Sequence, residues 1–141
     1  TLGGEWDVVK LLDFGLVQSI GSENDNRLTL KGMILGSPPF MSPDQAAGRT
    51  DLTAATDIYS VGGVGYFLLT GHPPFVRETP MELLLAHAYE EVPPLTNYIP
   101  GLPDDLQQVI LQCLGKKPAE RYAHVSELEA ALLRCSDARS W

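Results

Sequence analysis

Between Thr56 and Phe75 the sequence reads TDIYSVGGVGYFLLTGHPPF. Asp57 is its only acidic residue, and no charged residue occurs from Ile58 to Leu69. A segment that has no polar face at any period is expected to be packed on all sides by the rest of the chain. It is also shorter than the ~20 apolar residues that cross a bilayer. The stretch therefore predicts a central element in the hydrophobic core of a soluble domain.

The residues of this stretch leave helix and strand both open at first. Its three glycines disfavour a helix by about 1 kcal/mol each, and its β-branched residues also suit a strand. Length favours the helix, since buried strands usually stop at about 4–8 residues. Thr56 or Asp57 can cap the N-terminus, and Gly71 followed by Pro73 can end the helix. We expect a buried central helix whose glycines let neighbouring backbones approach closely.

Composition narrows the class of protein. The chain has 141 residues and a formal net charge of -8, so it lacks the basic character of a nucleic-acid-binding protein. Its two cysteines, Cys113 and Cys135, form no CxxC motif, which predicts a reducing, cytoplasmic setting. We find no signal peptide and no membrane-spanning segment in this piece. The first residue is Thr1 and not Met, so we expect either that the start has been processed or that the chain is a fragment of a longer protein.

The part of the chain before the central stretch reads as one short strand and two loops. Residues 8–12 are mostly apolar and predict a buried strand, which ends in the tripeptide Asp13-Phe14-Gly15. Residues 18–32 are polar, and residues 36–43 contain three prolines, so both segments are expected to be irregular. Irregular segments of this length in a compact domain are more often functional than not.

Three further helices are expected after the central one. The first spans Met81–Glu90. The second has Leu106, Val109, Ile110, Cys113 and Leu114 on one face, with Asp104 as its cap and Gly115 at its end. The third begins at Ser126, with Glu129 as its capping-box partner, and buries Leu128, Ala131 and Leu132. The histidines at 72, 87 and 124 lack the spacing of metal ligands. The fold class that we predict is mainly α.

Five short motifs occur in a fixed order along the chain. They lie at residues 8–15, 36–45, 57–62, 70–75 and 117–122. Together they resemble the C-terminal lobe of a protein kinase domain of the serine/threonine class, especially the bacterial type. The resemblance implies a partial kinase domain over residues 1–141, with a short strand region, a long activation segment at 16–38 and a buried central helix. An unrelated helical protein would require all five motifs to be accidental.

The resemblance assigns roles to residues near the N-terminus. Asp13 matches the kinase aspartate that holds Mg²⁺ on the phosphates of ATP, while Phe14 and Gly15 complete that cofactor-binding motif. By sequence alone, the tripeptide is equally compatible with a simple Asx turn after a strand. Thr29 matches the activating phosphothreonine of similar kinases, and Ser22 is a second candidate for phosphorylation. Either residue can also be an ordinary loop hydroxyl.

The stretch GSPPFMSPDQ at 36–45 resembles the end of the activation segment, which borders the protein substrate. Ser37, Pro38 and Phe40 are therefore expected to be substrate-binding. Ser37 replaces the usual threonine and keeps the hydroxyl, whereas Phe40 replaces the usual tyrosine and loses it. Asp44 replaces a glutamate that pairs with a distant arginine in the family, and Arg121 matches that arginine. We predict that Asp44 and Arg121 are in contact, the alternative being two unrelated surface charges.

The resemblance also gives Asp57 a structural role. In kinases the aspartate that opens the central helix accepts hydrogen bonds from the backbone of the catalytic loop. A simple helix cap at Asp57 would have nearby partners only. The chain contains no Gly-rich loop, phosphate-binding strand lysine or HRD motif, so the N-terminal lobe, the catalytic loop and the catalytic base are expected upstream of Thr1. Val61, Phe67, Leu68 or Ile58 is then expected to expose apolar surface.

These assignments predict part of a kinase that transfers the γ-phosphoryl group of ATP to serine or threonine hydroxyls of a protein substrate. ATP and Mg²⁺ are the implied cofactors of the complete protein. The fragment alone is predicted to be inactive, because phosphoryl transfer depends on positioning groups that it lacks. The alternative is a pseudokinase-like protein-interaction module, which the changes at Phe40 and Asp44 permit.

Overall fold

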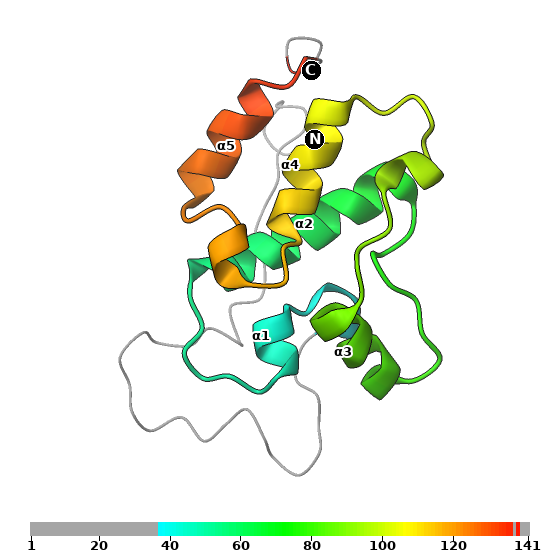
Figure 1. The fold of residues 1–141 in the computed structure, drawn as a ribbon, viewed down its shortest axis with the longest axis vertical. Helices are drawn as coiled ribbons and strands as arrows, with labels where there is room; N and C mark the ends of the chain where they lie inside the picture. Colours follow the sequence, from blue (N-terminus) through cyan, green and yellow to red (C-terminus); the bar gives the residue numbers. More distant parts are fainter. Residues whose placement is uncertain (1–36, 137, 139–141) are drawn as a thin grey trace, which may run out of the picture. The chain divides into compact units, whose positions relative to one another are not determined.

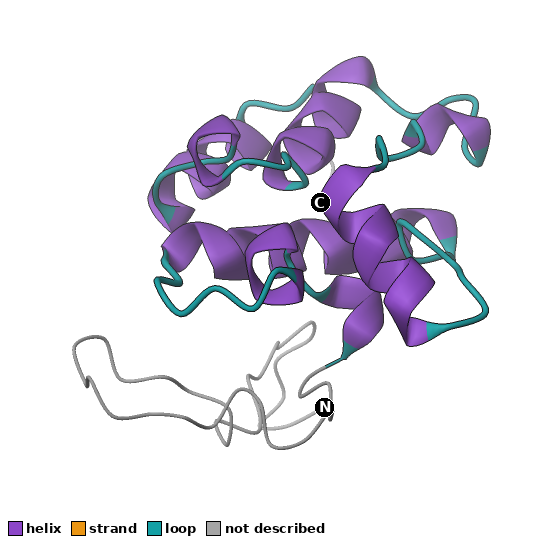
Figure 2. Ribbon diagram, turned by 60° about the horizontal axis from the view of Figure 1, so that its bottom comes forward, coloured by secondary structure: helices purple, strands orange, loops and turns teal. Residues whose placement is uncertain are grey.

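A computed structural model describes residues 37–136 and residue 138. Within these residues all regular elements are helical (Figures 1 and 2). The α-helices are α1 (Pro43–Ala46), α2 (Ala54–Thr70), α3 (Pro80–Tyr89), α4 (Asp104–Cys113) and α5 (Val125–Leu133). Single 3₁₀ turns are η1 (Pro38–Phe40), η2 (Leu95–Asn97) and η3 (Pro118–Glu120). The predicted mainly α class is confirmed, while the strand at 8–12 and most of the segment 16–38 lie outside the described residues.

Helix α2 is the central element that the sequence predicted. In Figure 1 it crosses the middle of the described part, with α4 and α5 on one side and α1 and α3 on the other. It begins earlier than expected, because Thr53 and not Thr56 or Asp57 is the N-cap, with Thr56 acting as its capping-box partner. It ends at Gly71, whose φ of 76° is the left-handed conformation that favours glycine.

Close packing between α2 and α4 explains one of the glycines. A Cβ atom at Gly62 would lie 2.5 Å from the Cβ of Cys113, so a side chain at this position is excluded. Cys113 itself is 1 % exposed and belongs to the main core, as predicted. Burial raises the pKa of its thiol to about 12, which makes it an inert core residue. The expectation that glycines bring backbones together is therefore confirmed at Gly62.

The prediction that α2 is packed on all sides is wrong. One face carries the buried residues Ile58, Tyr59 and Tyr66, whereas Val61, Phe67 and Leu68 on the other face are exposed. The expected exposure of apolar surface is thus confirmed at these three positions, with Leu68 the extreme at 76 %, but not at Ile58, which is only 3 % exposed. One face of an apolar helix can therefore be exposed to solvent in this chain, because hydropathy does not reveal which elements pack against the helix.

The boundaries of the C-terminal helices also differ in detail from the predictions. Pro103 is the N-cap of α4, and Asp104 lies in its first turn, where a carboxylate is favoured by the helix dipole. The C-cap of α4 is Leu114, one residue before the predicted Gly115. His124 is the N-cap of α5 and makes no side-chain cap bond, so the predicted capping box from Ser126 is wrong.

Among the described residues no helix is long and apolar enough to cross a membrane. The same part of the chain contains no group of three or more histidine, cysteine, aspartate or glutamate residues that could hold a metal ion.

Candidate functional site

The segment from Ser37 to Ala46 passes from the surface into the core. Ser37 is exposed, the turn η1 is half-buried, and Met41 to Asp44 are buried. Ser42 caps α1 by accepting a hydrogen bond from the backbone N–H of Gln45 at 3.2 Å. The Gln45 side chain accepts one from the Ser42 backbone at 3.0 Å. This capping box fixes the direction in which α1 leaves the segment.

Phe40 attaches the segment to α2. The hydroxyl of Ser60 donates a hydrogen bond to the carbonyl oxygen of Phe40 at 2.9 Å. The Phe40 ring lies against Gly63, where a Cβ atom would meet Cδ1 at 3.2 Å, and meets the edge of Phe67 with centroids 6.2 Å apart. The residue that replaces the family's tyrosine is therefore packed on α2 through its ring and its backbone.

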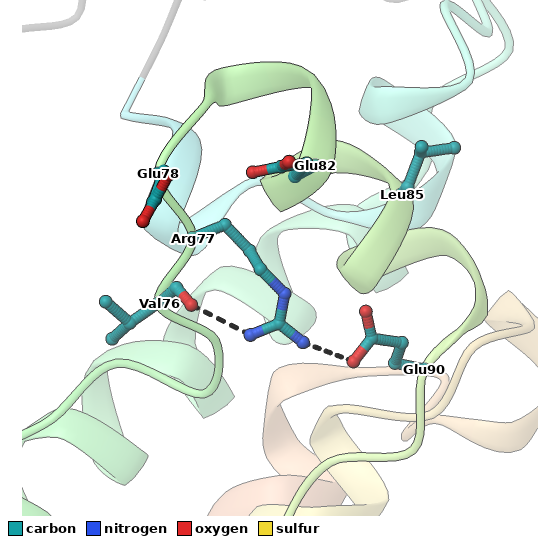
Figure 3. Close-up of a pocket in the computed structure, with 6 residues that line it drawn as sticks. All are labelled: Val76, Arg77, Glu78, Glu82, Leu85 and Glu90. Atoms are coloured by element: carbon teal, nitrogen blue, oxygen red, sulfur yellow. Dashed lines mark hydrogen bonds and ion pairs between the residues drawn. The ribbon is translucent and has the colours of Figure 1, made fainter.

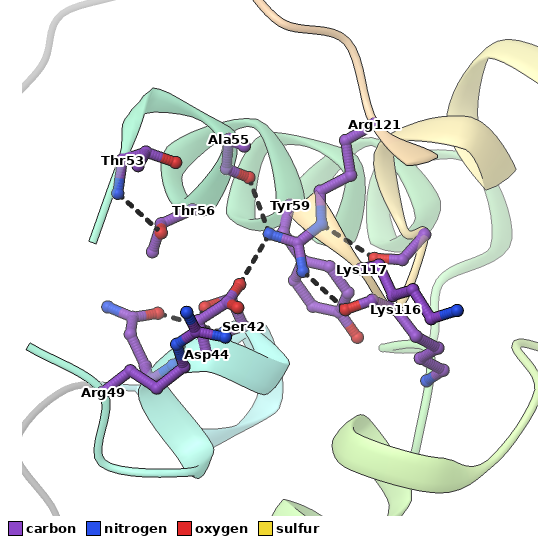
Figure 4. A network of polar contacts seen from close by, with 12 residues as sticks. Ser42, Asp44, Arg49, Thr53, Ala55, Thr56, Tyr59, Lys116, Lys117 and Arg121 are labelled. Carbon is purple, nitrogen blue, oxygen red and sulfur yellow. Dashed lines mark hydrogen bonds and ion pairs between the residues drawn. The ribbon is translucent and has the colours of Figure 1, made fainter. Parts of the chain in front are cut away.

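The predicted ion pair between Asp44 and Arg121 is present (Figure 4). Arg121 Nη1 lies 2.9 Å from Asp44 Oδ2, and the two side chains are 0 % and 9 % exposed. Oδ2 accepts no hydrogen bond of good geometry from the described residues, so the contact is one of charge. The shorter aspartate thus reaches the arginine as the family's glutamate is expected to do.

Arg121 also binds three backbone carbonyl groups. Its Nε donates to Gly115 at 2.7 Å, Nη1 donates to Ala55 at 2.9 Å, and Nη2 donates to Lys116 at 3.0 Å. Its guanidinium carbon lies 5.0 Å from the centre of the Tyr59 ring, within range of a cation–π contact. One side chain therefore joins α1, α2 and the loop between α4 and η3.

Tyr59 continues this polar network to α3. Its hydroxyl is hydrogen-bonded to Nδ1 of His87 at 2.8 Å, and both residues are fully buried. Burial and then the charge of Lys116 lower the pKa of His87 to about 4, so the imidazole is neutral near pH 7. Among the described residues, the other ring nitrogen, Nε2, has no hydrogen-bond partner.

Lys116 closes the C-terminus of α3. Its Nζ donates to the carbonyl oxygens of His87 at 2.9 Å and Ala86 at 3.4 Å. It also lies 4.7 Å from the centre of the Phe75 ring. Burial lowers the pKa of this ammonium group to about 8. A cation at the last carbonyls of a helix satisfies unpaired acceptors and the helix dipole together.

The structure brings together some of the residues that the sequence singled out. Helix α2 lies next to three of them: segment 37–40, Asp44 and Arg121. Asp57, in the first turn of the same helix, is exposed. No hydrogen bond to the Asp57 side chain occurs within the part of the chain that the structure describes. Asp13, Phe14, Gly15, Ser22 and Thr29 lie outside the described residues.

Sequence reasoning missed the residues that connect this region. Ser60 and Tyr59 lie inside an apolar run, and His87 lies on an ordinary helix without any motif. The only signal available was the presence of polar atoms in segments predicted to be buried, since such atoms require partners.

A surface pocket of about 550 Å³ lies beside α3 (Figure 3). It is lined by Val76, Arg77, Glu78, Glu82, Leu85 and Glu90. Arg77 donates to the Val76 carbonyl at 2.8 Å and pairs with Glu90, and Glu82 caps Thr79. Most of the charges of the pocket are thus satisfied internally, and the pocket is separate from the network of Arg121.

Comparison with known proteins gives a family match over most of the chain. The family model described as Protein kinase domain matches residues 3–132. Serine/threonine-protein kinase PknB of Mycobacterium tuberculosis (strain ATCC 25618 / H37Rv) is 36% identical over 129 residues, which are 91% of this chain and 20% of that protein. Serine/threonine-protein kinase Pkn1 of Myxococcus xanthus is also 36% identical over 129 residues, covering 92% of this chain and 18% of that protein.

A solved structure gives a consistent result. The twitchin kinase region from C. elegans matches with a TM-score of 0.58 and 28% sequence identity, over 67% of this chain and 16% of that one. The chain spans about a fifth of the length of the curated relatives named above, PknB and Pkn1.

Proposed function

Because this chain belongs to the protein kinase domain family, we propose that it is the C-terminal part of a kinase that phosphorylates serine and threonine residues of proteins. The complete kinase transfers the γ-phosphoryl group of ATP, in a reaction that depends mainly on positioning and electrostatic stabilisation. Residues 37–40 contribute the surface that holds the protein substrate, with Ser37 exposed to it. We assign the complete kinase domain to the cytoplasm.

The observation that carries this proposal is the way in which the segment 37–45 is fixed. Ser60 holds its first half on α2, and the buried ion pair of Asp44 with Arg121 holds its second half. A substrate-binding segment has to keep its geometry to within a fraction of an ångström, because small displacements are costly in rate. This anchorage would supply that rigidity from residues remote from the reacting atoms.

ATP and Mg²⁺ are proposed for the complete domain only. Asp13 would supply a carboxylate oxygen to Mg²⁺, as a hard cation requires, with Phe14 and Gly15 shaping the backbone beside it. Thr29, and secondarily Ser22, would be sites of activating phosphorylation in the segment 16–38. A phosphate added there would act by forming charge-assisted hydrogen bonds with basic groups.

The second candidate function is a protein-interaction module without catalysis. The replacements at Phe40 and Asp44 motivate it. Both residues nevertheless keep their structural partners, since Phe40 packs on α2 and Asp44 pairs with Arg121. These contacts favour the enzyme over the degenerate module.

The experiment that tests the proposal restores the missing part of the domain. Residues 1–141 would be joined to the N-terminal lobe and catalytic loop of the Mycobacterium tuberculosis PknB kinase, giving a completed domain. Transfer of labelled phosphate from ATP to casein is expected, and the variant Asp13→Ala is expected to abolish it. No transfer above the Asp13→Ala variant, from a completed domain that melts cooperatively, would overturn the proposal.

The 141-residue chain alone serves as the matched control. It is expected to show no transfer above its own Asp13→Ala variant, because it contains no Gly-rich loop and no HRD motif. Activity of the chain alone would contradict the assignment of the catalytic base to a missing segment.

A further inference from the structure

Helix α3 carries a stripe of apolar side chains on its outer face. Met81, Leu85 and Tyr89 follow one another at intervals of four residues, so they lie on one side of the helix. They are 65%, 50% and 81% exposed, whereas the buried residues of α3 lie on another side. A single exposed apolar residue is ordinary, but a continuous stripe of them is typical of a surface that binds another molecule.

The stripe borders the pocket beside α3, because Leu85 belongs to both (Figure 3). The exposed side chain of Val76 gives this pocket, of about 550 Å³, a second apolar wall. Its other lining residues are charged, and they are Arg77, Glu78, Glu82 and Glu90. Apolar side chains and carboxylates therefore line the same hollow.

Hydrogen bonding satisfies most of the charged groups of the pocket, but it does not balance their charge. Arg77 pairs with Glu90, so these two charges cancel. Glu82 accepts a hydrogen bond from the backbone N–H of Thr79, which orients the carboxylate and adds no positive charge. Among the described residues neither Glu82 nor Glu78 forms an ion pair. Two negative charges thus remain at the pocket, in a chain whose formal net charge is -8.

These surroundings suit a partner that offers apolar and basic side chains together. A lysine or arginine of the partner could lay its aliphatic stem along Val76 and Leu85 and bring its charge to Glu78 and Glu82. The apolar residues of the stripe repeat every ~6 Å along α3, which is also the spacing of apolar residues on a partner helix. A second copy of this chain fits less well, since a symmetric contact would place the same carboxylates opposite one another.

We propose that the stripe of Met81, Leu85 and Tyr89, with the adjoining pocket, is a docking surface for a basic amphipathic helix of a partner protein. The apolar face of that helix lies on the stripe, and its lysine or arginine residues pair with Glu78 and Glu82. The surface includes none of residues 37–40 and none of residues 13–15. The inference is therefore independent of the proposed function.

A fluorescein-labelled peptide of about four helical turns serves as the probe. Leucines form one face of its helix, and lysines flank that face on both sides. Fluorescence anisotropy with the 141-residue chain at low ionic strength is expected to show saturable binding that weakens as salt is added. A second peptide, with glutamate in place of every lysine, is expected not to bind. No saturable binding of the lysine peptide, or equal binding of the two peptides, would overturn the inference.

Paired substitutions distinguish this surface from the overall negative charge of the chain. Glu78→Gln/Glu82→Gln is expected to raise Kd for the lysine peptide about fivefold, because two exposed ion pairs are lost. The matched control, Glu127→Gln/Glu129→Gln on α5, changes the net charge equally at two other exposed positions and should change Kd less than about twofold. In each pair one carboxylate accepts a backbone hydrogen bond that glutamine can keep. Equal Kd values for the two pairs would contradict the proposed surface.

Leu85→Ala tests the apolar part of the surface and is expected to raise Kd about fivefold. Its control, Leu133→Ala on α5, removes the same side chain from a position that is 71% exposed and should leave Kd within about twofold. An effect of the same size in both variants would mean that the peptide does not lie on the stripe.

The completed domain tests whether the stripe stays accessible in a larger kinase. It should bind the lysine peptide with a Kd within about twofold of that of the 141-residue chain, whether or not it transfers phosphate. Loss of binding would show that an upstream part of the kinase covers the stripe. Self-association of the chain that Leu85→Ala abolishes would show that a second copy covers it. Either result would overturn the inference and leave the proposed function untouched.

Discussion

Arg121→Met would remove the guanidinium that holds the centre of the network while keeping an unbranched side chain. The Asp44 carboxylate, 9 % exposed, would lose its partner in the core. The buried carbonyl group of Ala55 and the half-buried carbonyl groups of Gly115 and Lys116 would lose their donors at the same time. Breaking a buried pair from one side typically costs about 3–5 kcal/mol. That is a large share of the ~5–15 kcal/mol that stabilises a domain.

The assay is urea denaturation of the 141-residue chain, followed by far-UV circular dichroism. The double variant Asp44→Asn/Arg121→Met is expected to be less destabilised than the sum of the single variants, because no lone charge remains in the core. Arg49→Ala is the matched control. It breaks the surface ion pair of Arg49 with Asp51, whose side chains are 53% and 67% exposed. The urea midpoint should therefore stay near that of the unsubstituted chain.

The reasoning would be refuted if Arg121→Met shifted the midpoint no more than Arg49→Ala does. Strict additivity of the two single substitutions would also contradict it, since it would mean that the two charges do not act on one another.

Further predictions concern packing, pH and solubility. Gly62→Ala should destabilise the chain by about 1–3 kcal/mol, less the ~1 kcal/mol that alanine gains in a helix, because its Cβ would lie 2.5 Å from that of Cys113. Gly65→Ala, whose Cβ would meet only the tip of an isoleucine, should be close to neutral in the same urea titration. The free energy of unfolding should fall by about 3 kcal/mol as pH drops from about 6.5 to about 4. In this range the unfolded state takes up a proton, whereas the folded state does not, because its His87 has a pKa lowered to about 4. An unchanged dependence of stability on pH in His87→Gln would refute this. Leu68→Lys, at the most exposed apolar position of α2, should reduce concentration-dependent light scattering with little change in the unfolding midpoint; equal scattering would show that this face does not drive association.

Ordered motifs predicted a contact between residues far apart in the sequence, whereas local propensity predicted only the type of each element. The contact of Asp44 with Arg121 followed from matching two motifs, and no local pattern could have given it. Helix boundaries were less certain, because Thr53, Thr56 and Asp57 are all acceptable caps and tertiary packing selects among them. The predicted roles of Asp13 and Thr29 remain predictions.

The polar contacts of α2 could not be predicted because they depend on which face of the helix meets which neighbour. Ser60 reads as one polar residue within an apolar run, yet its hydroxyl holds the carbonyl of Phe40. His87 shares its helix with exposed Leu85 and Tyr89, so neither hydropathy nor spacing marks it as buried. Such residues become visible only when buried donors and acceptors are matched in three dimensions.

The long separation of the partners of Arg121 has a consequence for synthesis on the ribosome. Ala55, whose carbonyl this arginine binds, precedes it by 66 residues. At a translation rate of about 5–20 residues per second, roughly 3–13 s pass between the emergence of the two. During that interval helix α1 and the start of α2 have been synthesised, but the arginine that binds both of them has not. The nascent chain is therefore expected to depend on chaperones until Arg121 has been synthesised.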